Sequence, residues 1–223
     1  MKNAHIVARF DEDLSKIKTR ILEMGKLVIS QIKDASAALE RLDASEVDRL
    51  IATDRRINGM NKDIHNRAER LIALRQPVAL DLRQAILPIN MAGELERIGD
   101  HAKSTAKLAR KLSDAGAGEQ VMRMVQEMSV LLQTMLAQAL IAYSHSDIKL
   151  AAEVREADKE VDRLNKAVFA AALQAIRQSP AEAEALVRLI LLARNFERGG
   201  DHVVNMARHV HQIVTGEDLK ASS

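Results

Sequence analysis

The chain contains one sequence pattern twice. The segment Glu96-Arg97-Ile98-Gly99-Asp100-His101 returns as Glu197-Arg198-Gly199-Gly200-Asp201-His202, with Ile98 against Gly199 as the one difference. Upstream of these segments, Asp54 matches Asp158 at the same separation as Met24 matches Met128. A repeated unit of this length predicts a fold of two similar halves.

Apolar residues recur every three or four positions along most of the chain, which is the period of an amphipathic α-helix. Ile17, Ile21, Met24 and Val28 form one such run. Nine glycines and three prolines among 223 residues are too few for a loop-rich β fold. The sequence therefore predicts an all-α protein of six long helices. The expected spans are 10–41, 46–75, 78–112, 119–143, 147–178 and 181–214.

One stretch, Asp114-Ala115-Gly116-Ala117-Gly118, is dense in turn-forming residues and divides the six helices into two sets of three. We expect residues 1–113 to form the first three-helix repeat, 114–118 a linker and 119–223 the second repeat. The predicted architecture is two tandem three-helix bundles that arose by internal duplication.

Composition excludes several kinds of protein. The chain has 33 Lys and Arg against 31 Asp and Glu, with no basic stripe, and only one Tyr and three Phe as aromatic residues, so nucleic-acid binding is not expected. Because it has no Cys, any bound metal would meet oxygen or imidazole ligands. The N-terminus shows no apolar signal region, and we expect a cytoplasmic protein.

Acidic residues four positions apart share one face of the third, fifth and sixth predicted helices, and the second helix has Asp54 and Asn58 at the matching places. When residues are counted outward from the two predicted helix turns, Asp54 falls opposite Asp100, and Asp158 falls opposite Asp201. The two candidate sets are Asp158, Asp162, Glu197 and Asp201 in the second repeat, and Asp54, Asn58, Glu96 and Asp100 in the first.

Carboxylates that converge across two helices repel one another, and this arrangement favours a bound cation. Oxygen ligands suit iron, manganese or magnesium, and zinc is also an option. Asn58 removes one charge, so the first repeat is expected to bind metal less tightly. The alternative is that these acids lie on solvated helix faces or pair with Arg97 and Arg198, in which case no metal is needed.

His101 and His202 follow the two aspartates by one position and lie about 100° round the helix from them. Each histidine is a candidate metal ligand, a candidate group to orient a carboxylate, or a partner in a hydrogen bond between helices.

At these residues the sequence resembles the PhoU family of phosphate-signalling regulators. The similar motifs are Asp54-x-x-x-Asn58, Gln76-Pro77-Val78-Ala79-Leu80-Asp81-Leu82-Arg83, Glu96-Arg97-Ile98-Gly99-Asp100, Asp158-x-x-x-Asp162 and Glu197-Arg198-Gly199-Gly200-Asp201. The resemblance implies a cytoplasmic helical protein that holds a multinuclear cluster of iron or zinc and represses the phosphate-starvation response and phosphate uptake. It also implies a homodimer that is an adaptor between the ATP-binding subunit of a phosphate ABC transporter and a sensor histidine kinase, so that it meets the membrane only through those complexes.

Two other functions compete with this interpretation. A ferritin-like dimetal protein also places carboxylates on bundle helices, but such sites carry Glu-x-x-His motifs, and none of the seven histidines here has Glu three positions before it. A metal-free helical adaptor of another transporter is the stronger rival. No nucleophile and base pair stands out, and we expect no enzymatic activity.

Overall fold

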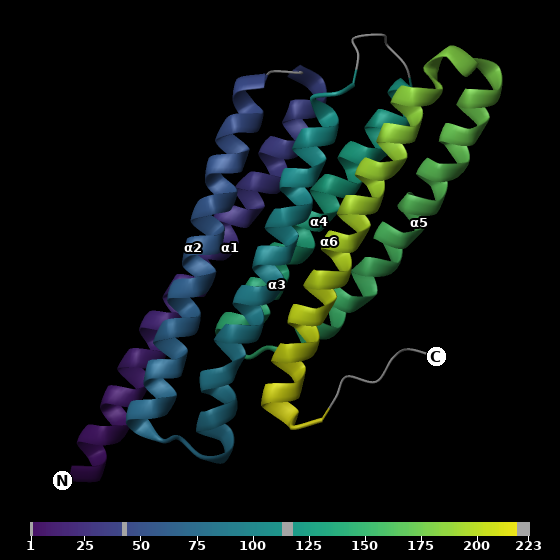
Figure 1. Ribbon diagram of the computed structural model, residues 1–223. Helices are drawn as coiled ribbons and strands as arrows, with labels where there is room; N and C mark the ends of the chain where they lie inside the picture. The colour runs from purple at the N-terminus through teal and green to yellow at the C-terminus, as the bar shows by residue number, and fades with distance from the viewer. Residues whose placement is uncertain (1, 42–43, 113–117, 218–223) are drawn as a thin grey trace.

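The computed structural model describes residues 2–41, 44–112 and 118–217, and these ranges are helical almost throughout (Figure 1). The six long helices are α1 (Lys2–Arg41), α2 (Ala44–Arg75), α3 (Ala79–Ala109), α4 (Glu119–His145), α5 (Ile148–Gln178) and α6 (Ala183–Thr215). No strand occurs in the described ranges. The predicted all-α fold of six helices is confirmed.

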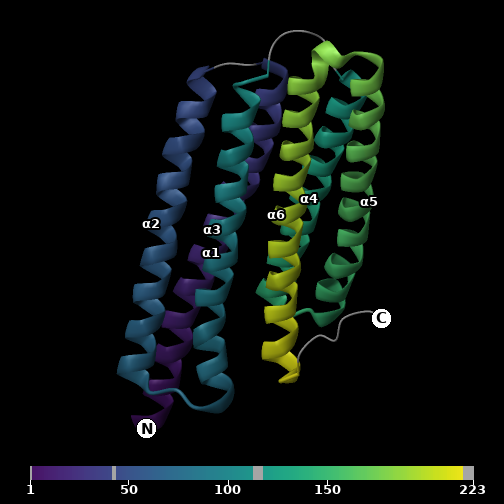
Figure 2. The same cartoon turned by 45° about the vertical axis from the view of Figure 1, so that its right-hand side comes forward.

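The helices form two three-helix bundles that lie side by side. Helices α1, α2 and α3 pack on one another, and so do α4, α5 and α6. The two repeats meet where α3 packs against α6 and α1 against α4, while α2 and α5 lie at opposite edges of the molecule (Figures 1 and 2). Each carboxylate set therefore lies on a helix pair within its own repeat. The first set is on α2 and α3, and the second is on α5 and α6.

The apolar stripe that predicted the first helix is the buried face of that helix. Ile21, Met24 and Val28 have no exposed surface, and Ile17 and Ile32 are nearly as buried. Their spacing of three and four residues keeps them on one side of an α-helix, and burial of each such side chain stabilises the fold by about 1.5–3 kcal/mol.

The largest error in the predicted boundaries is at the first helix, and the other ends differ by at most three residues, as at α3, which ends at Ala109 and not at residue 112. Helix α1 begins at Lys2, not at residue 10. The last helix begins at Ala183, because Pro180–Glu182 form a separate 3-10 turn ahead of it. Most of the predicted linker falls in 113–117, which lie outside the described residues.

Among the described helices, α4 is the one that is long and apolar enough to cross a membrane by length and composition. In its most apolar window, 44% of the residues are buried inside the bundle. A single helix of this kind is weak evidence for a membrane span, because a core helix of a bundle has the same features.

Tyr143 on α4 offers a test of the core. Its side chain is 2% exposed, its hydroxyl makes no hydrogen bond with the described residues, and burial raises the pKa of the phenol. A buried hydroxyl without a partner costs about 1–3 kcal/mol, so Tyr143→Phe should raise the free energy of unfolding by about 1 kcal/mol. Urea denaturation measures this, and a lower midpoint for the variant would contradict it.

Candidate functional site

The first repeat brings its two aspartates together around a lysine. Lys103 Nζ on α3 donates to Asp54 Oδ2 on α2 at 2.8 Å and to Asp100 Oδ1 at 2.6 Å. Asp54 is only 5% exposed, and the lysine side chain is 21% exposed. Burial alone would lower the pKa of Lys103, but the hydrogen bonds to Asp100 and Asp54 outweigh it and raise that pKa. The ammonium is thus held charged between the two carboxylates.

The other two candidates of this repeat differ in position. Glu96 is half-buried, and its pKa is raised by burial and by the charges of Asp100 and Asp54, so it lies near both. Asn58 is exposed on α2. The predicted register between α2 and α3 therefore places Asp54, Glu96 and Asp100 together, whereas Asn58 lies at the solvent edge of the group.

The second repeat gathers four carboxylates and no lysine. Burial, and then the charges of Asp162, Asp201 and Glu197, together raise the pKa of Asp158 to about 7. The pKa of Glu197 is also raised, first by burial and then by the charge of Asp201. None of the four makes an ion pair or hydrogen bond within the described ranges. The charges of Arg208 near Asp158, and of Arg198 and Arg194 near Glu197, offset the repulsion among these carboxylates only in part.

A glycine makes room for the most buried of these acids. A Cβ placed on Gly200 of α6 would lie 2.6 Å from Asp158 Oδ1, which is closer than real contacts allow. The matching residue of the first repeat, Gly99, faces Gln31 and Ile57 instead. Gly200 thus lets α5 and α6 approach with an aspartate between them.

A matched glycine pair tests that role. Gly59 on α2 has nothing within 4 Å of an added Cβ, so Gly59→Ala should stabilise the protein by about 1 kcal/mol through helix propensity alone. The free energy of unfolding should rise by at least about 1 kcal/mol less in Gly200→Ala than in Gly59→Ala, because Asp158 must move. Thermal unfolding of both variants measures the difference, and equal gains would show that the close contact costs nothing.

Two of the second-repeat carboxylates, Asp158 and Asp201, border a cleft of about 360 Å³. Its lining includes Asp158, Asp201 and Val204, together with the cationic Arg198 and Arg208. As the side chains stand, no three carboxylate or imidazole groups among the described residues are arranged to hold one metal ion. Because Asp162 and Asp201 are exposed, they can change rotamer toward an ion, so the donor set fits a hard cation in number and chemistry.

The two histidines turn toward the contact between the repeats. The rings of His101 and His202 lie with centroids 5.5 Å apart. His202 Nδ1 donates to Glu94 Oε2 at 2.7 Å, and His209 Nε2 lies 3.5 Å from Glu94 Oε1. The pKa of His101 is lowered by burial and by the charge of His202, and hydrogen bonding to Asn195 opposes this. Of the predicted roles, the contacts of His202 match a hydrogen bond between helices.

Glu94 was not among the residues predicted from the sequence. Its side chain is 18% exposed, and burial by itself would raise its pKa. Hydrogen bonds from His202 and His209 outweigh burial and hold that pKa at about 2. The carboxylate is therefore a charged contact between α3 and α6, and Asn195 occupies the matching place in the second repeat.

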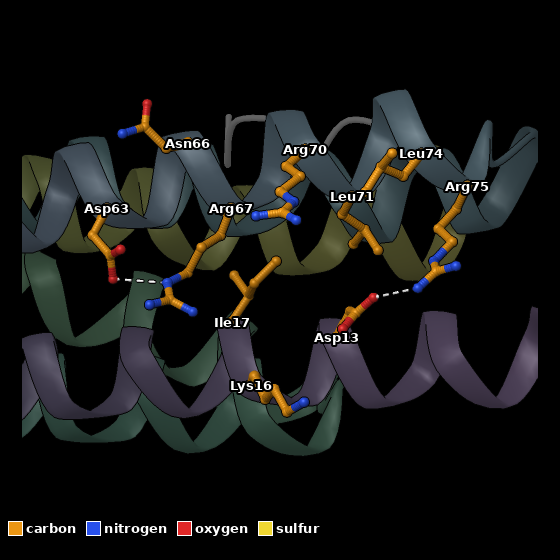
Figure 3. Close-up of a pocket in the computed structure, with 10 residues that line it drawn as sticks. All are labelled: Asp13, Lys16, Ile17, Asp63, Asn66, Arg67, Arg70, Leu71, Leu74 and Arg75. Atoms are coloured by element: carbon orange, nitrogen blue, oxygen red, sulfur yellow. Dashed lines mark hydrogen bonds and ion pairs between the residues drawn. The ribbon is translucent and has the colours of Figure 1, made fainter.

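A second polar surface lies between α1 and α2, in a groove of about 540 Å³ (Figure 3). Here the acids already have cationic partners. Arg75 Nη2 donates to Asp13 Oδ2 at 3.0 Å, and Arg67 Nε donates to Asp63 Oδ2 at 2.8 Å.

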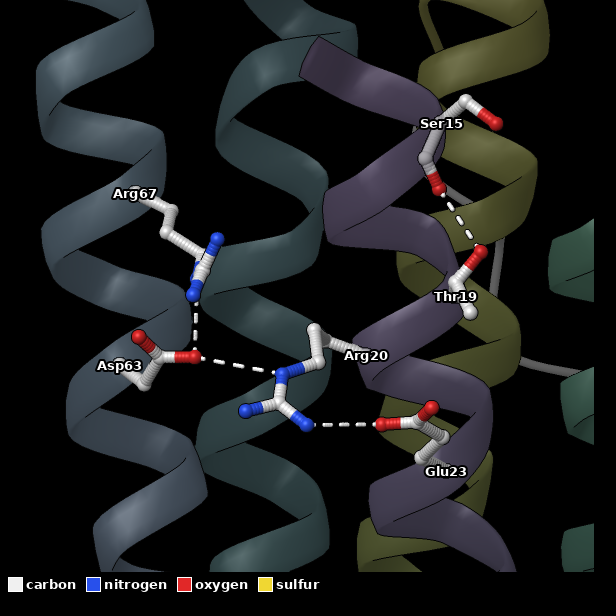
Figure 4. Close-up of polar contacts among 6 residues, drawn as sticks. All are labelled: Ser15, Thr19, Arg20, Glu23, Asp63 and Arg67. Atoms are coloured by element: carbon white, nitrogen blue, oxygen red, sulfur yellow. Dashed lines mark hydrogen bonds and ion pairs between the residues drawn. The ribbon is translucent and has the colours of Figure 1, made fainter. Parts of the chain in front are cut away.

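Asp63 also joins the two helices, because Arg20 Nε of α1 donates to it at 3.3 Å while Arg20 Nη1 donates to Glu23 at 2.9 Å (Figure 4). The hydrogen bond from Arg67 and the charge of that arginine, with smaller effects from Arg20, lower the pKa of Asp63. Exposed pairs of this kind contribute about 0.2–1 kcal/mol each. The acids of this groove thus lie in ion pairs, whereas the four acids of the second repeat form none within the described residues.

The fold and the two carboxylate clusters together define a class of protein: an all-helical, duplicated three-helix bundle with acids on the second and third helix of each repeat. Two stretches of the chain, residues 21–109 and 125–210, match the PhoU domain. The chain belongs to the PhoU family.

Full-length relatives agree with this assignment. The chain is 36% identical over 215 residues to the "Phosphate-specific transport system accessory protein PhoU homolog" of Caulobacter vibrioides, covering 96% of this chain and 94% of the relative. The crystal structure of PhoU from Pseudomonas aeruginosa superposes with a TM-score of 0.87 at 33% identity and covers 93% of this chain and 100% of that one. The phosphate transport system regulatory protein PhoU from Streptococcus pneumoniae gives a TM-score of 0.85 at 25% identity, with 95% and 100% covered.

Proposed function

We propose that this protein is a negative regulator of phosphate uptake and of the phosphate-starvation response. A role in the regulation of phosphate transport follows from membership of the PhoU family. The observation that carries the proposal is the ordered match of both repeats to one domain, together with similarity over almost the whole length to accessory proteins of phosphate-specific transport systems.

The proposed mode of action is that of an adaptor and not of a catalyst. Its partners would be the ATP-binding subunit of a phosphate ABC transporter and a sensor histidine kinase, reached from the cytoplasm by a homodimer. Long helices with interleaved charges of both signs support this role, because complementary charge gives specificity to regulated protein contacts. Co-purification at high and low phosphate, read by mass spectrometry, tests these partners.

Metal binding by the second repeat is the other part of the proposal. Asp158, Asp162, Glu197 and Asp201 would hold a cluster of iron or zinc, with manganese or magnesium as further options. A bound cluster supplies positive charge that removes the repulsion among these carboxylates. Helices α5 and α6 would then be held together by the metal that their carboxylates share. A regulatory partner would recognise this tighter packing of the two helices.

Deletion of the gene in a phosphate-replete cell tests the regulatory part. Phosphate-starvation genes should be switched on, and the intact chain should switch them off again. A chain with Glu197→Gln and Asp201→Asn should fail to do so if the carboxylates matter, whereas Glu182→Gln on the turn before α6, far along the helix from these acids, serves as the control. Unchanged reporter expression after deletion, with the transporter and kinase intact, would overturn the proposal.

Elemental analysis separates the metal-binding protein from a metal-free adaptor of another transporter. Protein purified without an affinity tag should carry metal that is lost in the Glu197→Gln and Asp201→Asn chain. A ferritin-like dimetal oxidase predicts oxygen consumption with Fe(II), and we expect none. A metal-free protein that still represses the reporter would leave the regulatory role intact and remove the metal from it.

A further inference from the structure

We propose that Lys103 acts as a built-in cation for the first repeat, so that its carboxylates take up no metal and only the second repeat holds an exchangeable ion. The statement about the first repeat stands on the geometry of Lys103. The statement about the second repeat rests on the proposed metal binding.

The ammonium occupies the position that a shared ion would need. Lys103 Nζ lies 2.8 Å from Asp54 Oδ2 and 2.6 Å from Asp100 Oδ1, so it contacts both aspartates that the α2 and α3 register brings together. Asp54 is 5% exposed, which leaves little surface through which another cation could approach it. The exposed Asn58 adds no charge at the rim.

The second repeat differs at this very position. Val204 stands where Lys103 stands in the first copy, since each follows its aspartate, Asp201 or Asp100, by three residues. Val204 lines the cleft that also reaches Asp158 and Asp201. An ammonium in one copy is therefore replaced by an apolar side chain in the other, beside an additional carboxylate at Asp162. The cations that line this cleft, Arg198 and Arg208, form no ion pair with Asp158 or Asp201 within the described residues.

The tethered cation has an advantage over a dissolved one. Lys103 is part of helix α3, so its charge is present at a high effective concentration and loses only side-chain rotamer freedom when it binds. A divalent ion must displace that ammonium into water before it can bind Asp54 and Asp100. The first repeat also offers the ion one acid fewer than the second repeat does, because Asn58 stands where Asp162 stands. Binding in the first repeat is thus disfavoured by competition and by charge.

A reciprocal exchange tests the inference with Mn²⁺ as the probe, measured by calorimetry and by the electron paramagnetic resonance of bound ion. The background carries Asp158→Asn and Glu197→Gln, which remove the second-repeat site. In this background the chain with Lys103 should show no Mn²⁺ binding. Lys103→Val should bind Mn²⁺ with a dissociation constant at least tenfold below the highest Mn²⁺ concentration tested, and it should unfold at a higher temperature when Mn²⁺ is added. Lys107→Val, one turn further along α3, is the matched control and should bind none.

The reverse change uses the otherwise unaltered protein. Val204→Lys should weaken Mn²⁺ binding by the second repeat at least tenfold, and it keeps the test decisive if Lys103→Val does not fold. The inference is overturned if the background chain binds Mn²⁺ with Lys103 in place, if a folded Lys103→Val chain gains no binding, or if Val204→Lys leaves the affinity unchanged. Failure of the unaltered second repeat to bind Mn²⁺ would count against the proposed metal function, while the Lys103→Val result would still decide the role of the lysine.

Discussion

Asp158→Asn should stabilise the metal-free protein while it strongly weakens metal binding. The pKa of Asp158 is raised from 3.8 to about 7 in the folded chain, so its ionisation opposes folding increasingly as the pH rises from about 4 to 7. Asparagine carries no charge at any pH. We expect the variant to be more stable by about 2 kcal/mol at pH 8, which is roughly half of the full shift because the carboxylate is only partly shielded from water.

The two halves of this expectation are measured separately. Urea denaturation in the presence of a chelator should show the gain at pH 8 and no difference near pH 4. Metal affinity should fall at least about a hundredfold, or about 3 kcal/mol, because one ligand is lost. Glu153→Gln, an exposed change on the same helix, is the control and should alter neither quantity. A loss of stability at pH 8 would mean that the folded protein favours the ionised carboxylate.

Glu94→Gln should lower the free energy of unfolding by about 2 kcal/mol at pH 7. The pKa of this carboxyl falls from 4.5 to about 2 on folding, through its hydrogen bonds with His202 and His209. A depressed pKa contributes stability that is fully present above the unfolded value and is lost as the pH falls from about 4.5 to 2. The difference between the variant and the parent should therefore shrink by more than half between pH 7 and pH 3.

Chemical denaturation across this pH range provides the measurement. Glu69→Gln on α2, which is exposed, is the matched control and should show little effect at either pH. An equal loss at pH 7 and pH 3 would attribute the effect to packing between α3 and α6 and not to charge.

The fold was predictable because its cause is local and repeated. A helical period such as that of Ile17, Ile21 and Met24 depends only on neighbouring residues, and the duplication fixed the number of units. Counting from the helix turns was enough to place Asp54 near Asp100, since antiparallel helices rise equally per residue. The start of α1 was placed too late, although Ile6 and Val7 precede Phe10 by four and three residues and so continue the helical period.

The contacts that decide the chemistry were harder to predict. Lys103 follows Asp100 by three positions, a spacing also common on solvated faces, and only its replacement by Val204 in the second copy marks it out. His101 and His202 sit at an angle that allows either the acids or the other repeat as a neighbour. The partnership of His202 with Glu94 depends on how two bundles dock, and no local pattern encodes that docking.

The difference between Lys103 in the first repeat and Val204 at the equivalent position of the second also affects which repeat unfolds locally first. In the first repeat an ion pair ties α2 to α3, whereas in the second repeat like charges on α5 and α6 push these helices apart. Local opening of a protein begins where the stabilising contacts are fewest. Without metal, amide hydrogens beside Asp158 should therefore exchange with solvent sooner than those beside Asp54. The first repeat therefore stays folded while the second opens locally, and the second repeat packs against it again when it refolds.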